Sequence, residues 1–244
     1  MKTIKNILGG IWAFWGLLTF TITFLLFFGP TMLSYLFKNF AKGQKFYIDV
    51  SRIWIRIWLV IIACPYRIFG NENFKKDKNY VVVYNHNAFL DVPMSCVFLP
   101  GANKTIAKDS FTKVPIFGWF YKRGGIMVDR KDERSRVKSY EAMKDVLNQG
   151  MHMCLYPEGT RNRTDKPLKE FYDGAFKLAI DAKKEIIPCI IKGTTTAMPI
   201  RKGFFLKPTK LTMHYLPAIS SENIDVKTLN AKVHAIMLEE FLKP

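Results

Sequence analysis

The longest uncharged stretch of the chain lies between Lys5 and Lys38, where 32 consecutive positions carry no acidic or basic side chain. About 20 apolar residues are enough for a helix to cross a bilayer. A cleaved signal peptide is disfavoured, because the apolar part is too long and no small-residue cleavage site follows it. We therefore expect residues 1–65 to form a membrane-attached helical region and residues 66–244 to form a separate domain.

Two topologies of this stretch stay open. Gly29-Pro30 interrupts it, so it can form one long tilted span or a helical hairpin that turns at this dipeptide. Lysines flank both ends, and the positive-inside rule therefore favours both ends on the cytoplasmic side. A hairpin that dips into one leaflet satisfies that rule better than a single crossing. We expect the chain at the cytoplasmic face of the cell inner membrane, embedded through its N-terminal region.

A second apolar segment, Phe46–Ala63, has a different character. Arg52 and Arg56 are four residues apart and share one helical face, whereas Trp54 and Trp58 mark another. Snorkelling arginines and amphipathic aromatic rings favour an amphipathic helix at the membrane interface. The alternative is a helix packed on the soluble domain.

The charge of the chain calls for an anionic partner. Its formal net charge is +17, and residues 51–244 alone carry 32 basic and 19 acidic side chains. Such an excess suits a phospholipid surface, a phosphorylated substrate, an acidic carrier protein or nucleic acid. The aromatic pattern by which proteins stack single-stranded bases is not evident, so we expect no nucleic-acid partner.

Cysteine and histidine spacing argues against disulfides and metal. The cysteines at positions 64, 96, 154 and 189 are widely spaced, and three of them lie among apolar residues. This is typical of free thiols packed in a core, in a reducing compartment. The histidines at 86, 152, 214 and 234 form no zinc-ligand pattern, so we expect no bound metal or cofactor.

From Asn71 onward, short apolar runs alternate with helical patterns. We expect strands at residues 80–84, 104–107, 126–128, 151–156, 186–191 and 211–216. We expect helices at residues 92–99, 115–121, 135–149, 174–183 and 226–242. This alternation predicts an α/β fold, with a largely parallel or mixed sheet flanked by helices and preceded by the N-terminal membrane-embedded segment. Functional loops are expected at the carboxyl ends of the strands.

Three of these strand ends carry polar clusters. The first is Asn85-His86 with Asp91, the second is residues 124–130 and the third is residues 156–163. A histidine can take a proton near neutral pH, and a carboxylate can fix its tautomer. Arginine forks, available in the second and third clusters, match phosphate oxygens. Each cluster alone has an ordinary structural explanation, but their recurrence at successive strand ends favours one site.

Four motifs occur in the order found in the glycerolipid acyltransferase family. They are Asn-His-x-x-x-x-Asp at 85–91, Gly-x-x-x-Asp-Arg at 125–130, Pro-Glu-Gly-Thr-Arg at 157–161 and Ile-Pro-Cys-Ile at 187–190. Over residues 80–192 the chain resembles this family, and within it the bacterial lysophosphatidate acyltransferases.

The resemblance implies a transfer reaction with assigned residues. His86 corresponds to the general base and Asp91 to its partner. The other matched positions correspond to substrate-binding residues: Lys108 before the second motif; Gly125 and Arg130 in it; Glu158, Gly159, Thr160 and Arg161 in the third, acceptor-phosphate motif; and Pro188 on the acyl-donor side. The implied acceptor is lysophosphatidate, which becomes phosphatidate in phospholipid biosynthesis. The implied co-substrate is acyl-CoA or acyl-acyl carrier protein.

One departure from the family pattern leaves the acceptor open. The family commonly has a Phe-Lys-x-Gly segment after the third motif, whereas this chain has Phe171-Tyr172-Asp173-Gly174. Lys169 and Lys177 can replace part of the missing positive charge. A same-family enzyme for another lyso-lipid therefore stays as an alternative, as does a non-catalytic membrane protein that binds anionic lipid.

Overall fold

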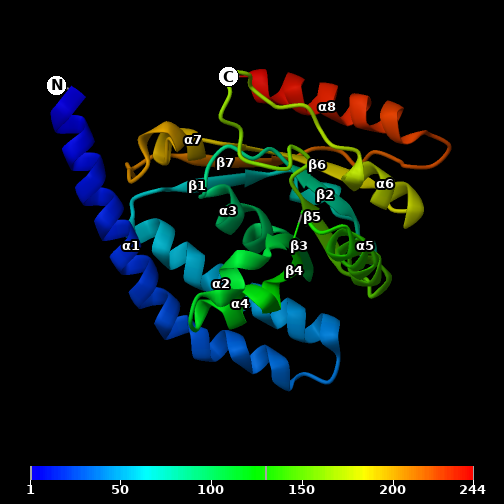
Figure 1. Cartoon of the computed structure of the whole chain (residues 1–244), viewed down its shortest axis with the longest axis horizontal. Helices are drawn as coiled ribbons and strands as arrows, with labels where there is room; N and C mark the ends of the chain where they lie inside the picture. The colour runs from blue at the N-terminus through cyan, green and yellow to red at the C-terminus, as the bar shows by residue number, and fades with distance from the viewer. Residues whose placement is uncertain (1, 130, 244) are drawn as a thin grey trace.

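A seven-stranded sheet forms the centre of the protein in the computed structural model, which describes residues 2–129 and 131–243 (Figure 1). The strands are β1 Tyr66–Phe69, β2 Val81–Tyr84, β3 Asn103–Lys108, β4 Gly125–Val128, β5 His152–Leu155, β6 Ile186–Lys192 and β7 Leu211–Tyr215. The helices are α1 Lys2–Met32, α2 Phe40–Ile61, α3 Asp91–Phe98, α4 Phe117–Gly124, α5 Glu133–Asn148, α6 Gly174–Asp181, α7 Thr194–Ala197 and α8 Val226–Leu242.

The strand order is β1-β7-β6-β2-β5-β3-β4. The five strands from β6 to β4 are parallel, whereas β7 runs antiparallel to β6 and parallel to β1. The mixed α/β sheet predicted from the sequence is thereby confirmed. Because β2 and β5 are neighbours, the loops that follow them leave the same edge of the sheet side by side.

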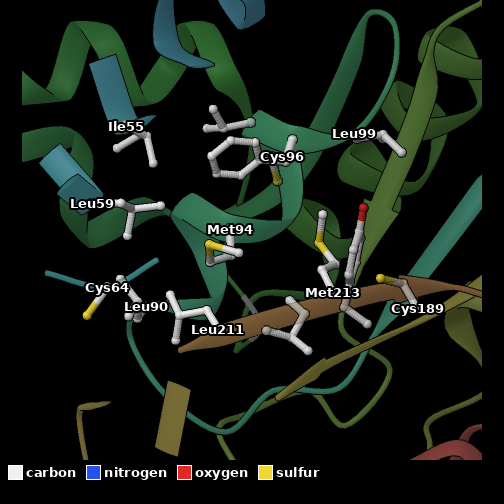
Figure 2. Close-up of a cluster of buried hydrophobic side chains, with 14 of the residues drawn as sticks. Ile55, Leu59, Cys64, Leu90, Met94, Cys96, Leu99, Cys189, Leu211 and Met213 are labelled. Carbon is white, nitrogen blue, oxygen red and sulfur yellow. The ribbon is translucent and has the colours of Figure 1, made fainter. Parts of the chain in front are cut away.

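Alternate residues of β2 face two different hydrophobic cores, one on each side of the sheet. Val82 and Tyr84 face the core formed with α1, α2 and α3, whereas Val81 and Val83 face the core formed with α5, α6 and α8. A strand buried on both faces is expected to be apolar throughout, as this one is. Figure 2 shows part of the first core, where side chains of α2, α3, β6 and β7 converge: Ile55, Leu59, Met94, Cys96, Cys189, Leu211 and Met213 among them. All four cysteines are buried and free, which the apolar surroundings predicted for Cys96, Cys154 and Cys189.

The two N-terminal helices form an antiparallel pair, but its turn does not lie at Gly29-Pro30. Helix α1 continues through that dipeptide to Met32, and the turn follows at residues 33–39. Residues 33–42, the turn together with the start of α2, are called the elbow below. A proline removes one backbone hydrogen bond, and a helix packed along its length can tolerate that loss. Among the described residues, Thr3–Leu36 is the one helical segment long and apolar enough to cross a membrane.

Helix α2 is packed against the rest of the protein, which corrects the interfacial interpretation of its tryptophan face. Trp54 and Trp58 are buried, and their indole N–H groups donate to Thr23 Oγ1 (2.9 Å) and to the Gly16 carbonyl (3.0 Å) of α1. Arg52 donates to backbone carbonyls at the end of α3 and beyond it rather than extending to a membrane surface. By contrast, much of the outward face of α1 is apolar and exposed, including Ile4, Ile7, Leu8, Ile11, Phe14, Ile22, Leu25 and Leu26.

Most predicted elements lie within two residues of their observed bounds, and two were missed. Strand β1 has only four residues and an alternating pattern too short to stand out. Helix α7 is a single turn of threonines and alanine. Such short elements carry little periodic signal, because one helical turn or two strand repeats fall within the range of chance.

Candidate active site

The site begins where β2 ends. Nδ1 of His86 lies 3.0 Å from Oδ2 of Asp91, the first residue of α3. The same carboxylate oxygen accepts hydrogen bonds from the backbone N–H groups of Asn87 (2.6 Å) and Ala88 (2.7 Å). The loop therefore folds back over the start of the helix, so that two residues five apart in sequence face each other. An acidic side chain at a helix N-terminus is also electrostatically favourable.

These contacts determine which imidazole nitrogen carries the proton. An ionised carboxylate can only accept hydrogen bonds, so Nδ1 of His86 must donate to Asp91. Nε2 is then the nitrogen with a free lone pair, and it makes no hydrogen bond within residues 2–129 and 131–243. The Asp91 carboxylate is fully buried, whereas the imidazole keeps some exposure to solvent. The pair can therefore accept a proton from a molecule that reaches Nε2.

Glu158 and Asn162, in the loop that follows β5, hold the backbone of His86 through its N–H and its carbonyl group. Oε1 of Glu158 accepts the His86 N–H at 2.7 Å, and the His86 carbonyl accepts the N–H of Asn162 at 2.7 Å. The second oxygen of Glu158 accepts the backbone N–H of Lys169 (3.2 Å). Burial raises the pKa of the Glu158 carboxyl to about 7. Both carboxylate oxygens of Glu158 thus contact backbone N–H groups.

A tyrosine ring holds the imidazole from one face. Tyr156 stacks on His86 with 4.3 Å between ring centroids and 29° between ring planes. Its hydroxyl lies 2.6 Å from Oγ of Ser95 on α3, so the tyrosine is itself fixed at its far end. The imidazole is thus restricted by a carboxylate at its edge and an aromatic ring at its face.

Arg161 of the third motif and Lys169, which follows the motif, form a cationic rim next to this pair. The Arg161 guanidinium carbon lies 3.5 Å from the ring centroid of Phe89, in the loop between His86 and Asp91. Nζ of Lys169 donates to Oγ1 of Thr160 (2.9 Å) and to the Glu158 carbonyl (3.1 Å). Guanidinium and ammonium groups close to this histidine–carboxylate pair are suited to holding a phosphate beside it.

Glycine is required at position 159 for two reasons. Its φ is +72°, a left-handed conformation that other residues rarely adopt, and a Cβ there would come 2.8 Å from the ring of Tyr172. Tyr172 also donates its backbone N–H to the Pro157 carbonyl (2.9 Å). The segment that departs from the family pattern is therefore packed directly against the third motif.

The remaining predicted site residues lie elsewhere. Lys108 ends β3 with an exposed side chain, at the same sheet edge as His86. Gly125 is the first residue of β4, so it lies at the opposite edge of the sheet from His86 and Lys108. A Cβ at this position would come 2.6 Å from the Ala107 Cβ. Pro188 is buried inside β6, paired with Val83. These last two positions bear on strand packing, and the predicted Arg130 lies outside the described residues.

Sequence reasoning missed Asn85 and Asn162 as supports of the site. The Asn85 side chain donates to the Ile191 carbonyl (2.9 Å) and accepts the Ile191 N–H (2.7 Å), which fixes the end of β2 to β6. Of the two substitute lysines, Lys169 lies at the site, whereas Lys177 pairs with Asp181 on α6 (3.2 Å). An asparagine next to a histidine was the only local signal, and it did not reveal the partner strand.

The other histidines are held by structural contacts. His152 is buried in β5, where Nδ1 accepts the Tyr80 N–H (3.1 Å), and burial lowers its pKa to about 4. His214 pairs with Glu240 at 2.6 Å, and His234 contacts the Lys169 carbonyl at 3.2 Å. None of the three lies at the end of β2 with His86.

Comparison with known proteins shows which family the chain belongs to. A family model described as Acyltransferase matches residues 66–192, which is more than half of the chain. The chain belongs to this family. The acyltransferase match covers all the strands from β1 to β6, together with the predicted site residues.

Curated relatives of this acyltransferase-family chain share one name. This chain is 31% identical over 218 residues to a 1-acyl-sn-glycerol-3-phosphate acyltransferase of Chlamydomonas reinhardtii, and the alignment covers 87% of this chain and 62% of that protein. It is 29% identical over 178 residues to the 1-acyl-sn-glycerol-3-phosphate acyltransferase of Saccharomyces cerevisiae, covering 71% and 58%. The chain therefore spans less than two thirds of the length of these relatives.

A solved structure shares the whole fold. The crystal structure of the 1-acyl-sn-glycerophosphate acyltransferase PlsC from Thermotoga maritima superposes with a TM-score of 0.80 and 20% sequence identity. The match covers 99% of this chain and 96% of that chain. Because it extends over the full chain, the α1–α2 pair belongs to the common architecture as much as the sheet does.

Proposed function

We propose that the chain transfers a fatty acyl group from a thioester donor to the sn-2 hydroxyl of lysophosphatidate, which yields phosphatidate. The observation that carries the proposal is the His86–Asp91 pair, which leaves Nε2 with a free lone pair beside the cationic rim. The shared name of the curated relatives supports the choice of acceptor.

In this mechanism the acceptor hydroxyl donates its proton to Nε2 of His86 as its oxygen attacks the thioester carbonyl. Asp91 accepts the hydrogen bond from Nδ1–H and stabilises the imidazolium that forms. The carbon–sulfur bond then breaks, and the departing thiolate takes the proton back from the imidazolium. General-base assistance of this kind is typically worth about 10²–10⁴-fold in rate. The attack is direct, so the scheme requires no acyl-enzyme, metal or cofactor.

The acceptor phosphate is assigned to the cationic rim. Arg161 is supported by the Phe89 ring, and Lys169 is held near Thr160 and Glu158, so both cations lie close to the loop that carries His86. From the family resemblance, Arg130 remains a proposed phosphate-binding residue and Lys108 a proposed substrate-binding residue. Gly159 permits the tight turn that presents this loop, and Pro188 remains proposed for the acyl-donor side.

The acyl donor and the membrane complete the proposal. The net charge of +17 suits acyl-CoA or acyl-acyl carrier protein, since both donors are anionic. We assign residues 1–65 to a membrane-attached region and residues 66–244 to the acyltransferase domain. The α1–α2 pair lies at the cytoplasmic side of the cell inner membrane, with the exposed apolar face of α1 in one leaflet. This attachment brings both lipid substrates to the site.

A second acceptor is favoured by one specific contact. Tyr172, which stands where the family commonly has lysine, packs against Gly159 of the third motif and is 70% exposed. The change therefore falls where the acceptor headgroup is assigned, and a lyso-lipid other than lysophosphatidate is the competing substrate.

Thiol release on a panel of acceptors tests the proposal. The full chain in phospholipid–detergent micelles is given an acyl-CoA or an acyl-acyl carrier protein, with lysophosphatidate and with zwitterionic and glycerol-headgroup lyso-lipids in separate reactions. Turnover with lysophosphatidate that is lost in His86→Gln supports the proposal. Turnover with another acceptor alone replaces the substrate, and a folded chain with no turnover on any acceptor overturns the enzymatic assignment.

A further inference from the structure

Two cations lie close to one aromatic ring, that of Phe40, at the elbow and at the opposite end of the strands from His86. Arg123, in the last turn of α4, is 4% exposed and donates through Nε to Ser34 Oγ (3.0 Å) and through Nη2 to the Ser34 carbonyl (3.3 Å). Its guanidinium carbon lies 4.7 Å from the ring centroid of Phe40 and 4.9 Å from that of Tyr35. The arginine thus ties the elbow to the sheet domain.

Lys104 is the second cation. It lies near the start of β3, at the sheet edge opposite to His86, and its Nζ is 5.0 Å from the Phe40 ring centroid. The side chain is half-buried, and the ammonium makes no ion pair or hydrogen bond within the described ranges. Burial, together with the positive charge of Arg123, lowers the pKa of Lys104 to about 8.

This pair of charges lacks the compensation that partly buried cations normally have. Two like charges in a medium of low polarity repel each other, and buried charges are usually paired with an opposite charge. Within residues 2–129 and 131–243, no carboxylate pairs with either Lys104 or Arg123. The interactions with the Phe40 ring offset only part of this cost. An anion beside Lys104 would supply the compensating charge.

The surroundings indicate where that anion comes from. Five residues at the elbow expose large apolar side chains: Leu33, Tyr35, Leu36, Phe37 and Phe40. Lys38 and Lys42 are exposed among them. Apolar side chains at a tip, with basic residues set just behind them, are typical of a segment that enters the acyl-chain region while its charges meet lipid headgroups.

We propose that the elbow holds a binding site for the phosphate of an anionic bilayer phospholipid, in which Lys104 contacts the phosphate and Arg123 supplies a second positive charge behind it. Phe40 and Tyr35 flank the site and contact the glycerol and first acyl carbons. The inference rests on the proposed membrane attachment and is independent of the proposed chemistry at His86. The bound lipid would fix how the protein sits on the membrane, at the opposite sheet edge from the active site.

Amine footprinting of the wild-type full chain tests the site directly. A limiting amount of an acylating reagent is added at pH 8, and modification of each lysine is measured by mass spectrometry with vesicles of phosphatidylcholine alone or phosphatidylcholine with phosphatidylglycerol. Lys42, exposed on the same elbow, reports general attraction to the surface, which for one lysine is about fivefold in local affinity. Lys232, exposed on α8, reports reagent activity.

The expected result is that phosphatidylglycerol slows modification of Lys104 clearly more than that of Lys42 and leaves Lys232 unchanged. Equal protection of Lys104 and Lys42, or equal protection by neutral vesicles, overturns the site. Protection by inorganic phosphate at the same phosphate concentration overturns the lipid assignment. Acyl transfer is assayed in the same samples, so protection of Lys104 without turnover counts against the proposed function alone.

A pair of variants gives a second readout. Lys104→Met keeps the apolar stem of the side chain and removes its charge, and Lys42→Met removes one charge from the same elbow. Co-sedimentation with the two vesicle types is expected to show a several-fold loss of anionic preference for Lys104→Met and a smaller loss for Lys42→Met. Equal losses in the two variants, with unchanged melting temperatures, would contradict the proposal.

Discussion

Glu158 accepts the backbone N–H of His86 at 2.7 Å across 72 residues of sequence. The loop that leaves β5 therefore fixes the loop that leaves β2, and the catalytic histidine of the proposed mechanism is held by a residue of another motif. Both carboxylate oxygens of Glu158 are engaged by backbone N–H groups, of His86 and of Lys169. This carboxylate is expected to act on the rate through the position of His86.

The stability of the protein is expected to depend on pH through Glu158. Burial raises its pKa from an ordinary 4.5 to about 7, so between these values the folded protein keeps a proton that the unfolded chain has lost. Stability therefore falls as the pH rises from 4.5 to 7, by up to about 3 kcal/mol. Glu158→Gln removes this titration, so the difference in unfolding free energy between pH 5 and pH 8 should shrink. Denaturant unfolding in detergent micelles measures it.

Glu170→Gln is the control for this measurement, since Glu170 is exposed and lies only twelve residues further on. It should leave the pH dependence of the wild type intact. If Glu158→Gln and Glu170→Gln have the same pH dependence, the raised pKa of Glu158 plays no part in stability.

Substitution of the histidine–aspartate pair should abolish most turnover without unfolding the protein. His86→Gln removes the proton acceptor, and Asp91→Asn removes the charge that stabilises the imidazolium, so each is expected to lower kcat by about 10²–10⁴-fold. The double variant should be little worse than the worse single variant, because the two residues act as a unit. Additive losses in the double variant would show that the residues act separately.

The central strands and their exits were predictable, because their signals are local. The apolar run before Asn85 identifies β2, and the polar residues that follow identify its exit. The supports of His86 were not predictable, since they depend on strand order. Asn85 bonds to Ile191 because β6 lies beside β2, and Tyr156 stacks on His86 because β5 lies on the other side. No periodicity in the sequence specifies which strands are neighbours.

The hairpin of α1 and α2 illustrates the limit of local rules. Gly29-Pro30 is a typical helix-breaking signal, yet α1 continues to Met32. The helix there packs through Phe24 and Phe28 against the aromatic residues of α4, including a stacked pair of Phe28 and Trp119 at 6.2 Å. Tertiary contacts of this kind compensate for the backbone hydrogen bond that proline removes.

The aromatic face of Tyr156 should matter more than its hydroxyl. Tyr156→Phe keeps the stack on His86 and loses the contact with Ser95, whereas Tyr156→Leu loses both. An aromatic pair is worth about 0.5–1.5 kcal/mol, so Tyr156→Leu should lower kcat by up to about tenfold, and Tyr156→Phe by less. Melting temperatures separate this role from simple destabilisation, because Tyr156→Leu should lower kcat even well below the temperature at which it unfolds. Equal effects of the two variants would assign the role to the hydroxyl.

Arg161 and Phe89 should act together on acceptor binding. The guanidinium carbon lies 3.5 Å from the Phe89 ring centroid, so the ring restricts the arginine that is proposed to hold the acceptor phosphate. Arg161→Lys loses the planar fork and should raise the KM for lysophosphatidate by about tenfold or more, since hydrogen bonds to charged groups contribute about 1.5–3 kcal/mol. Phe89→Leu should raise it by a few-fold, as expected for an exposed cation–π contact of about 0.5–1 kcal/mol.

The KM for the acyl donor should stay unchanged in both variants, because only the acceptor phosphate depends on Arg161. Phe204→Leu is the matched control, since Phe204 is 57% exposed and Phe89 is 58% exposed. In Arg161→Lys/Phe89→Leu the two effects should be less than additive, because the ring acts through the arginine that the first substitution has already replaced. Full additivity, or an increase in donor KM alone, would place Phe89 in contact with a different substrate.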